Sequence, residues 1–125
     1  HAEAHFNWGI ALEALGRPQE AIVHYQEAVR IKPNLADAHY NLGNALLKLG
    51  RPREAIEHYR QAVRLKPDFA EAHNNLGIVY RAGGRLPDAI RHFERALRLK
   101  PDYNAAQRNL RETRATMKRV MKDEG

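Results

Sequence analysis

The sequence repeats itself with a period of 34 residues. The spacing relates one set of prolines, one of glycines and two of alanines: Pro33, Pro67 and Pro101; Gly9, Gly43 and Gly77; Ala21, Ala55 and Ala89; and Ala28, Ala62 and Ala96. A fixed period of about 20 to 50 residues is the signature of repeat architectures. We therefore expect three copies, at residues 2–35, 36–69 and 70–103, followed by a divergent segment at 104–125.

Each copy holds two helical patterns with a break between them. In the middle copy, apolar residues between Ala38 and Leu49 recur at steps of three and four, which is the period of a helix face. Gly50 then ends the first helix, Pro52 begins the second, and Pro67 prevents its continuation. Two short helices cannot bury their apolar faces alone, so successive pairs must stack. The pattern predicts an all-α solenoid.

The conserved spacing carries a family resemblance. The middle copy has Leu42, Gly43, Leu46, Ala55, Tyr59 and Pro67; copy one has Trp8, Gly9, Leu12, Ala21, Tyr25 and Pro33; copy three has Leu76, Gly77, Tyr80, Ala89, Phe93 and Pro101. These residues resemble the pattern of the tetratricopeptide repeat family, although histidine takes its first tryptophan position. The resemblance implies a right-handed superhelical solenoid of three helix-turn-helix repeats with a C-terminal capping helix.

Glycine and asparagine recur inside the first helix of each copy, where both are poor helix formers. A glycine costs roughly 1 kcal/mol relative to alanine in a helix. We expect Gly43 to lie where the two helices of a pair approach closely, opposite the small Ala55. A Cβ at Gly43 would push the helices apart.

The asparagines form a column: Asn7, Asn41, Asn75 and Asn109. The resemblance places the column on the concave surface, as in the similar repeat arm of O-linked N-acetylglucosamine transferases. An amide has donors and an acceptor, so it can bond the backbone of an extended peptide whatever the peptide's side chains are. The alternative is structural, with each asparagine bonding a neighbouring repeat. The sequence leaves both roles open.

The neighbouring groove positions would then set specificity. The candidate peptide-binding residues are Phe6, Asn7, Ile10, Tyr40, Asn41, Asn44, Leu47, Lys48, Asn74, Asn75, Ile78, Arg81 and Asn109. Their mixture of aromatic, aliphatic and basic side chains suggests a ligand that is extended, partly apolar and mildly acidic near Arg81. Family members that grip acidic chaperone tails use a clamp of lysines, arginines and asparagines. Of that clamp only Asn75 is present here, because its other positions hold Phe6, Ile10 and Glu71.

The residues for catalysis or metal binding are not apparent in the sequence. There are no cysteines, and no glycine-rich phosphate loop follows a strand pattern. The seven histidines include two columns at the repeat spacing, but residues one repeat apart are separated by roughly 8 to 10 Å of helix packing. Such a column cannot converge on one ion, whose ligands lie about 2.0 to 2.1 Å away. We expect a protein-protein interaction scaffold without enzyme activity, metal or cofactor.

Charge leaves two alternative functions open. The net charge is +6, and Arg30, Lys32, Arg64 and Lys66 are among cations that recur at the end of every second helix. These cations complement the helix dipoles. Stacked copies could also present them to the phosphates of nucleic acid. The lack of interleaved exposed aromatic residues, on which bases could stack, disfavours that alternative. The other alternative is a structural or self-assembling spacer, associating through the uncapped first copy. No apolar run is long enough to span a bilayer, and the lack of cysteine fits a reducing compartment such as the cytoplasm.

Overall fold

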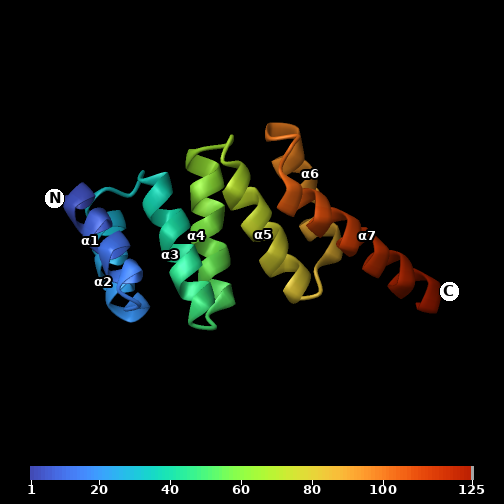
Figure 1. The fold of residues 1–125 in the computed structure, drawn as a ribbon, viewed down its shortest axis with the longest axis horizontal. Coiled ribbons are helices and arrows are strands. Elements are labelled where there is room, and N and C mark those ends of the chain that lie inside the picture. Colours follow the sequence, from blue (N-terminus) through green and yellow to red (C-terminus); the bar gives the residue numbers. More distant parts are fainter. Residues whose placement is uncertain (125) are drawn as a thin grey trace. The chain divides into compact units, whose positions relative to one another are not determined.

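The computed structural model describes residues 1–124, which form seven α-helices and no strand (Figure 1). The helices are α1 (Ala2–Ala14), α2 (Pro18–Ile31), α3 (Ala36–Lys48), α4 (Pro52–Leu65), α5 (Ala70–Ala82), α6 (Leu86–Leu99) and α7 (Asn104–Glu124). Residue 125, the last of the predicted C-terminal segment, lies outside the described residues. The two helices expected in each copy are therefore present, and one further helix follows them.

The helices belong to two compact units. The first unit, His1–Pro67, contains α1 to α4, and the second begins at Asp68 and contains α5 to α7. In the first unit, α1 packs along α2, α3 packs along α4, and α2 also contacts α3. In the second unit, α6 packs against both α5 and α7, and α5 also contacts α7. Each helix pair thus has a further helix on one side.

A glycine with positive φ follows the first helix of every pair. Gly16, Gly50 and Gly84 have φ of 72°, 73° and 80°. Residues other than glycine rarely adopt this left-handed backbone conformation. A Cβ at any of the three positions would meet nothing within 4 Å. The glycines are therefore required by the backbone of the turn and not by packing. A proline in the first turn of α2, α4 and α6 then begins the second helix.

The core of each pair is an aromatic ring packed on a glycine. Tyr25, Tyr59 and Phe93 are fully buried. A Cβ at Gly43 would lie 2.7 Å from Cε1 of Tyr59, and one at Gly77 would lie 2.5 Å from Cε1 of Phe93. The expected close approach at Gly43 is present, and the atoms nearest to it belong to the Tyr59 ring and not to Ala55. Tyr59 is one helical turn beyond Ala55, and its long side chain reaches across the pair.

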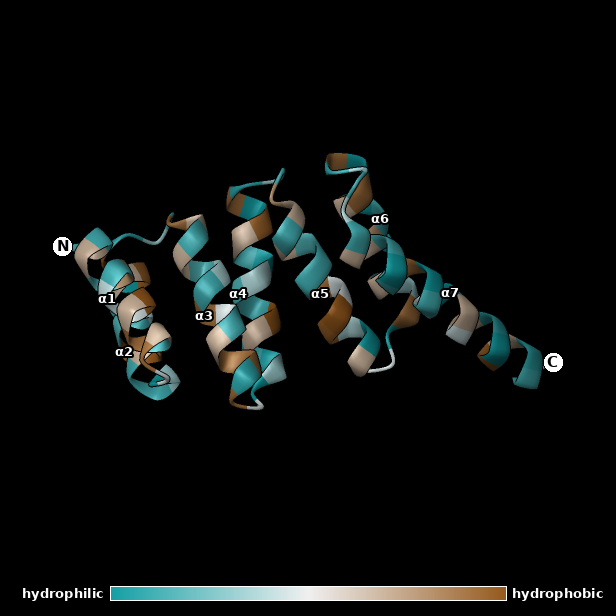
Figure 2. Ribbon diagram, viewed as in Figure 1, coloured by the Kyte–Doolittle hydropathy of each residue, from teal (hydrophilic) through white to brown (hydrophobic). Residues whose placement is uncertain are grey.

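Helix α7 covers α6 with its first half. Ala106, Leu110 and Thr113 are buried and Met117 is half-buried, but Val120 is 43% exposed. The apolar stripe of α7 is thus covered over its first turns only. The rest of α7 is mainly hydrophilic (Figure 2). None of the helices in residues 1–124 is long and apolar enough to cross a membrane.

Candidate peptide-binding faces

The first unit carries eight of the predicted groove residues on α1 and α3. We call the surface formed by Phe6, Asn7, Ile10, Tyr40, Asn41, Asn44, Leu47 and Lys48 the α1/α3 face. Asn7, Ile10 and Lys48 are exposed, and the other five are partly buried. The Nζ atom of Lys48 lies 3.3 Å from a carboxylate oxygen of Glu13, so a polar contact joins the C-terminal parts of α1 and α3.

The buried Tyr25 contacts the same Glu13 carboxylate. Its hydroxyl donates a hydrogen bond to Glu13 at 2.5 Å and also bonds the side chain of Asn41. Burial, reinforced by Glu13, raises the pKa of Tyr25 well above its usual value, whereas the bond from Asn41 lowers that pKa. Because Tyr25 stays protonated, it remains a donor to Glu13. One member of the asparagine column is therefore tied to the preceding helix pair.

The aromatic residues of the α1/α3 face rest on the buried tyrosines. The ring centres of Phe6 and Tyr25 are 6.1 Å apart, and those of Tyr40 and Tyr59 are 6.0 Å apart, with tilts of 46° and 50°. Asn44 accepts a hydrogen bond from the Tyr59 hydroxyl. Tilted rings at these distances attract one another and hold the partly exposed rings in place. The face therefore has fixed aromatic platforms beside its amides.

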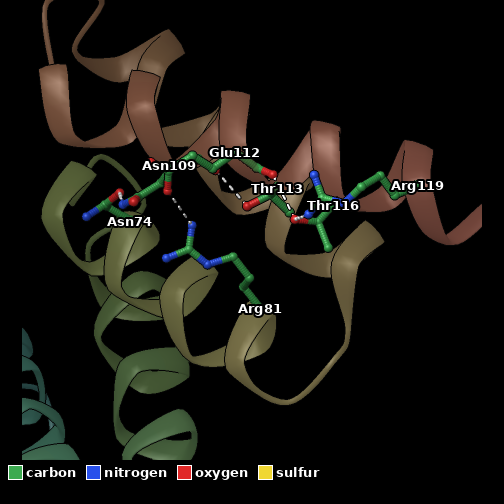
Figure 3. A network of polar contacts seen from close by, with 7 residues as sticks. All are labelled: Asn74, Arg81, Asn109, Glu112, Thr113, Thr116 and Arg119. Carbon is green, nitrogen blue, oxygen red and sulfur yellow. Dashed lines mark hydrogen bonds and ion pairs between the residues drawn. The ribbon is translucent and has the colours of Figure 1, made fainter.

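The second unit carries the other five predicted residues. We call the surface of Asn74, Asn75, Ile78, Arg81 and Asn109 the α5/α7 face. Asn109 Nδ2 donates to Asn74 Oδ1 at 3.2 Å, and the two residues are only 6% and 4% exposed (Figure 3). Within α7, the Thr113 hydroxyl donates to the Asn109 backbone carbonyl at 2.6 Å. Asn74 and Asn109 thus join α5 to α7, while Asn75, Ile78 and Arg81 are partly exposed.

Arg81, the predicted site for an acidic ligand, already has an acidic neighbour. Its guanidinium lies 3.6 Å from a carboxylate oxygen of Glu112 (Figure 3). The guanidinium carbon is also 5.9 Å from the ring centre of Phe93. The Arg81 side chain is 30% exposed and that of Glu112 is 57% exposed. Both therefore remain within reach of a ligand. An acidic ligand would have to compete with Glu112 for Arg81.

Tyr25 and Glu112 are among the residues of these networks that were not predicted as site residues from the sequence. Tyr25 was identified only as a family position, and nothing in the pattern indicated that its hydroxyl would bond Glu13 and Asn41. Glu112 lies 34 residues after Ile78, a candidate groove position, so the period alone could have identified it. The period predicts which residues share a face, but not which of them bond each other.

Several of the cations that could contact nucleic acid are paired with carboxylates. Arg30 contacts Glu27, Lys32 contacts Glu3 at 3.1 Å, and Arg114 contacts Glu94 at 2.6 Å. Each pair is at least partly exposed, so its net contribution to stability is small. The pairing nevertheless reduces the positive field that these cations would present to phosphates. It further weakens the nucleic-acid alternative.

Comparison with family models identifies the repeats. A model described as "Tetratricopeptide repeat" matches residues 40–104, and one described as "TPR repeat" matches residues 14–50. No curated protein sequence matches the chain. Repeats of this family generally form non-catalytic scaffolds for protein interaction.

Solved structures share the fold at low sequence identity. The first TPR of Spaghetti (RPAP3), bound to the HSP90 peptide SRMEEVD, superposes with a TM-score of 0.90 at 24% identity, covering 93% of this chain and 92% of that one. YrrB, described as a TPR protein with an unusual peptide-binding site, superposes with a TM-score of 0.80 at 24% identity. The match covers 86% of this chain and 56% of YrrB. MamA superposes with a TM-score of 0.80 at 22% identity, and the match covers 98% of this chain and 81% of MamA. The predicted all-α fold is confirmed, and the chain belongs to the tetratricopeptide repeat family.

Proposed function

We propose that this chain is a protein-interaction scaffold that binds extended peptide segments on its α1/α3 and α5/α7 faces. Two of the similar structures are described by their peptides or peptide-binding sites, namely the first TPR of Spaghetti and YrrB. The predicted groove residues of each unit lie on helices that polar contacts join to one another. A bound segment would lie across these helices.

The observation that carries the proposal is the pairing of amides with fixed rings on the α1/α3 face. Asn7 is exposed and Asn41 is partly exposed at equivalent positions of α1 and α3. Phe6 and Tyr40 precede them and are held by Tyr25 and Tyr59. Amides can bond a peptide backbone, while the rings offer apolar contacts to its side chains. Together they suit an extended, partly apolar ligand.

A variant that combines Asn7→Ala, Asn41→Ala and Asn75→Ala tests the amides. We expect binding to weaken about tenfold or more, because each lost hydrogen bond is worth about 0.5 to 1.5 kcal/mol. Binding would be measured on a random peptide array, with SRMEEVD as a reference peptide, and by titration of the strongest hits. The variant should melt within a few degrees of the wild type.

Asn34→Ala provides the matched control, because Asn34 is exposed in the loop between α2 and α3 and lies on neither face. It should leave both binding and melting unchanged. If the triple variant binds the same peptides as the wild type, the amides do not hold the ligand. If it melts far below the wild type, the column is structural, as the Tyr25–Asn41 bond would then explain.

The proposed mild acidity of the ligand is tested by Glu112→Gln. Removing this carboxylate frees Arg81 from its neighbour at 3.6 Å. An exposed pair is worth about 0.2 to 1 kcal/mol, so acidic peptides should bind up to about fivefold more tightly at low salt. Isothermal titration with acidic peptides and their amide counterparts would measure the change. Asp123→Asn removes the same charge elsewhere on α7; an equal gain from that control would mean that Arg81 is not involved.

A second candidate function is self-association through α1, with a second copy of this chain as the partner. Trp8 is 56% exposed, whereas Leu42 and Leu76, at the same position of α3 and α5, are fully buried. Leu15, which directly follows α1, is 69% exposed. An apolar side that is buried in the equivalent helices suits a protein contact.

Sedimentation velocity across a wide concentration range tests this candidate. We expect the wild type to shift toward a dimer at high concentration and Trp8→Gln to remain monomeric, because the largest exposed apolar side chain is removed. Val23→Gln, which replaces an exposed apolar residue of α2, is the control. A wild type that stays monomeric at the highest concentration rules out self-association.

A further inference from the structure

A pair of histidines bridges the two helices of every repeat. The Nδ1 atoms lie 3.1 Å apart in His5–His24, 3.1 Å in His39–His58 and 3.2 Å in His73–His92. The sequence showed two columns of histidines running along the repeats. The structure shows that the contacts run between the columns, from one helix of a pair to the other.

The hydrogens of the His39–His58 pair follow from its contacts. His39 Nε2 lies 3.0 Å from the carbonyl oxygen of Pro33. A carbonyl only accepts, so Nε2 carries the hydrogen, and in a neutral ring Nδ1 is then an acceptor. His58 Nδ1 must therefore donate to His39 Nδ1. This leaves Nε2 of His58 as the acceptor at which a further proton can bind.

Successive protons have different effects on this arrangement. A first proton at Nε2 of His58 leaves the bond between the two rings in place and strengthens it, because the donor is then charged. A second proton can only enter at Nδ1 of His39. Two N–H groups would then face each other across 3.1 Å, and both rings would be positive. The bond between α3 and α4 cannot survive the second proton.

The surroundings oppose protonation of both rings. Burial is the main cause that lowers the pKa of His39, which is 7% exposed, and Arg64 lowers that pKa further, while the Pro33 carbonyl raises it. Burial also lowers the pKa of His58; His39 adds to this, and Glu57 and Glu54 oppose it. The charged groups that act on the pair thus come from α4, and the loop after α2 contributes the carbonyl.

A metal is not the better occupant of this position. In residues 1–124 no group of three or more histidine, aspartate or glutamate side chains is placed to hold an ion. Zinc sites in proteins use three or four protein ligands. The pair supplies two nitrogens, which the hydrogen bond already satisfies.

We propose that the His39–His58 pair is a one-proton latch between α3 and α4, which acid opens. The latch is closed with no extra proton or with one, and open with two. A histidine whose pKa is lower in the folded chain binds protons more readily when unfolded. The stability contributed by the pair is therefore fully present above the ordinary histidine pKa of about 6.5 and is lost as the pH falls below it.

Urea unfolding of the wild type and His58→Gln between pH 7.5 and pH 5.0 tests the latch. The glutamine amide can still donate to His39 Nδ1 but cannot bind a proton. We expect the free energy of unfolding of the wild type to fall as the pH is lowered. The slope of this fall should be smaller in the variant, by an amount that corresponds to at most about one proton taken up on unfolding. His1→Gln removes an exposed histidine, and the stability of this variant should depend on pH as that of the wild type does. Equal slopes for wild type and His58→Gln would overturn the proposal.

Nitrogen-15 NMR of the wild-type rings tests the same latch without relying on a variant that folds. At pH 7.5 the spectra should show the Nε2–H form of His39 and the Nδ1–H form of His58. In acid, His58 should titrate before His39. The Nε2–H form at His58, or titration of His39 first, would contradict the assignment of the shared hydrogen.

Discussion

Gly43→Val is expected to lower the free energy of unfolding by about 2 to 3 kcal/mol, because it overpacks a filled core. The new Cβ would lie 2.7 Å from Cε1 of Tyr59, and the Tyr59 ring is fully buried, with no room to withdraw. Valine's better helix propensity recovers only a few tenths of this cost. Urea unfolding followed by circular dichroism would measure the loss.

Gly83→Val is the matched control, because Gly83 has no positive φ and a Cβ there would meet only backbone oxygens at 3.7 Å. It should change stability by no more than about 0.5 kcal/mol. A variant that combines Gly43→Val and Tyr59→Leu should lose less stability than the two single variants lose together, since the smaller side chain makes room for the valine. Equal stability of Gly43→Val and the wild type would show that the ring can move.

Phe93→Ala should cost about 3 to 5 kcal/mol, the range found when a buried aromatic side chain is truncated. Phe93 is fully buried beside Gly77, so no neighbouring Cβ can fill the space that the ring leaves. Typical domains are stable by about 5 to 15 kcal/mol, so this loss would consume much of the stability of the second unit. Hydrogen exchange should show faster exchange throughout α5, α6 and α7.

The control for this cavity is Arg95→Ala on the exposed side of the same helix, which should lie within about 0.5 kcal/mol of the wild type. Phe93→Leu should fall between the control and Phe93→Ala, because it removes fewer buried atoms. If Phe93→Ala loses less than about 1 kcal/mol, the site collapses around the smaller side chain.

The fold was predictable because its determinants are local and repeated. Gly50 marks the turn and Ala38 one side of the first helix, and each recurs in all three copies, while a proline follows the turn glycine within three residues every time. The helix bounds follow these signals closely, and α3 extends from Ala36 to Lys48. Contacts between side chains of different helices were less accessible. The ring facing Gly43 depends on how far Tyr59 reaches across the pair, which spacing alone does not give.

The candidate site was predictable as a set of positions, but its polar connections were not. The 34-residue period aligns Asn109 with Asn75, but the hydrogen bond of Asn109 is to Asn74, one position away, and both of the bonded residues are buried. The same period hid the histidine pairs, because His39 and His58 are 19 residues apart and belong to different columns. Contacts within a repeat cross the period, so a search along it misses them.

The packing of a ring on a glycine also limits how these repeats can diverge in evolution. At Gly9, Gly43 and Gly77 a larger residue cannot be accepted first, since the facing ring already fills the space. A lineage must shrink the ring before it can enlarge the glycine, and the intermediate carries a cavity. Loss of the hydroxyl leaves the ring in place, and the third repeat has Phe93 where the other two have tyrosine. The order of substitutions is therefore fixed by geometry, in each repeat separately.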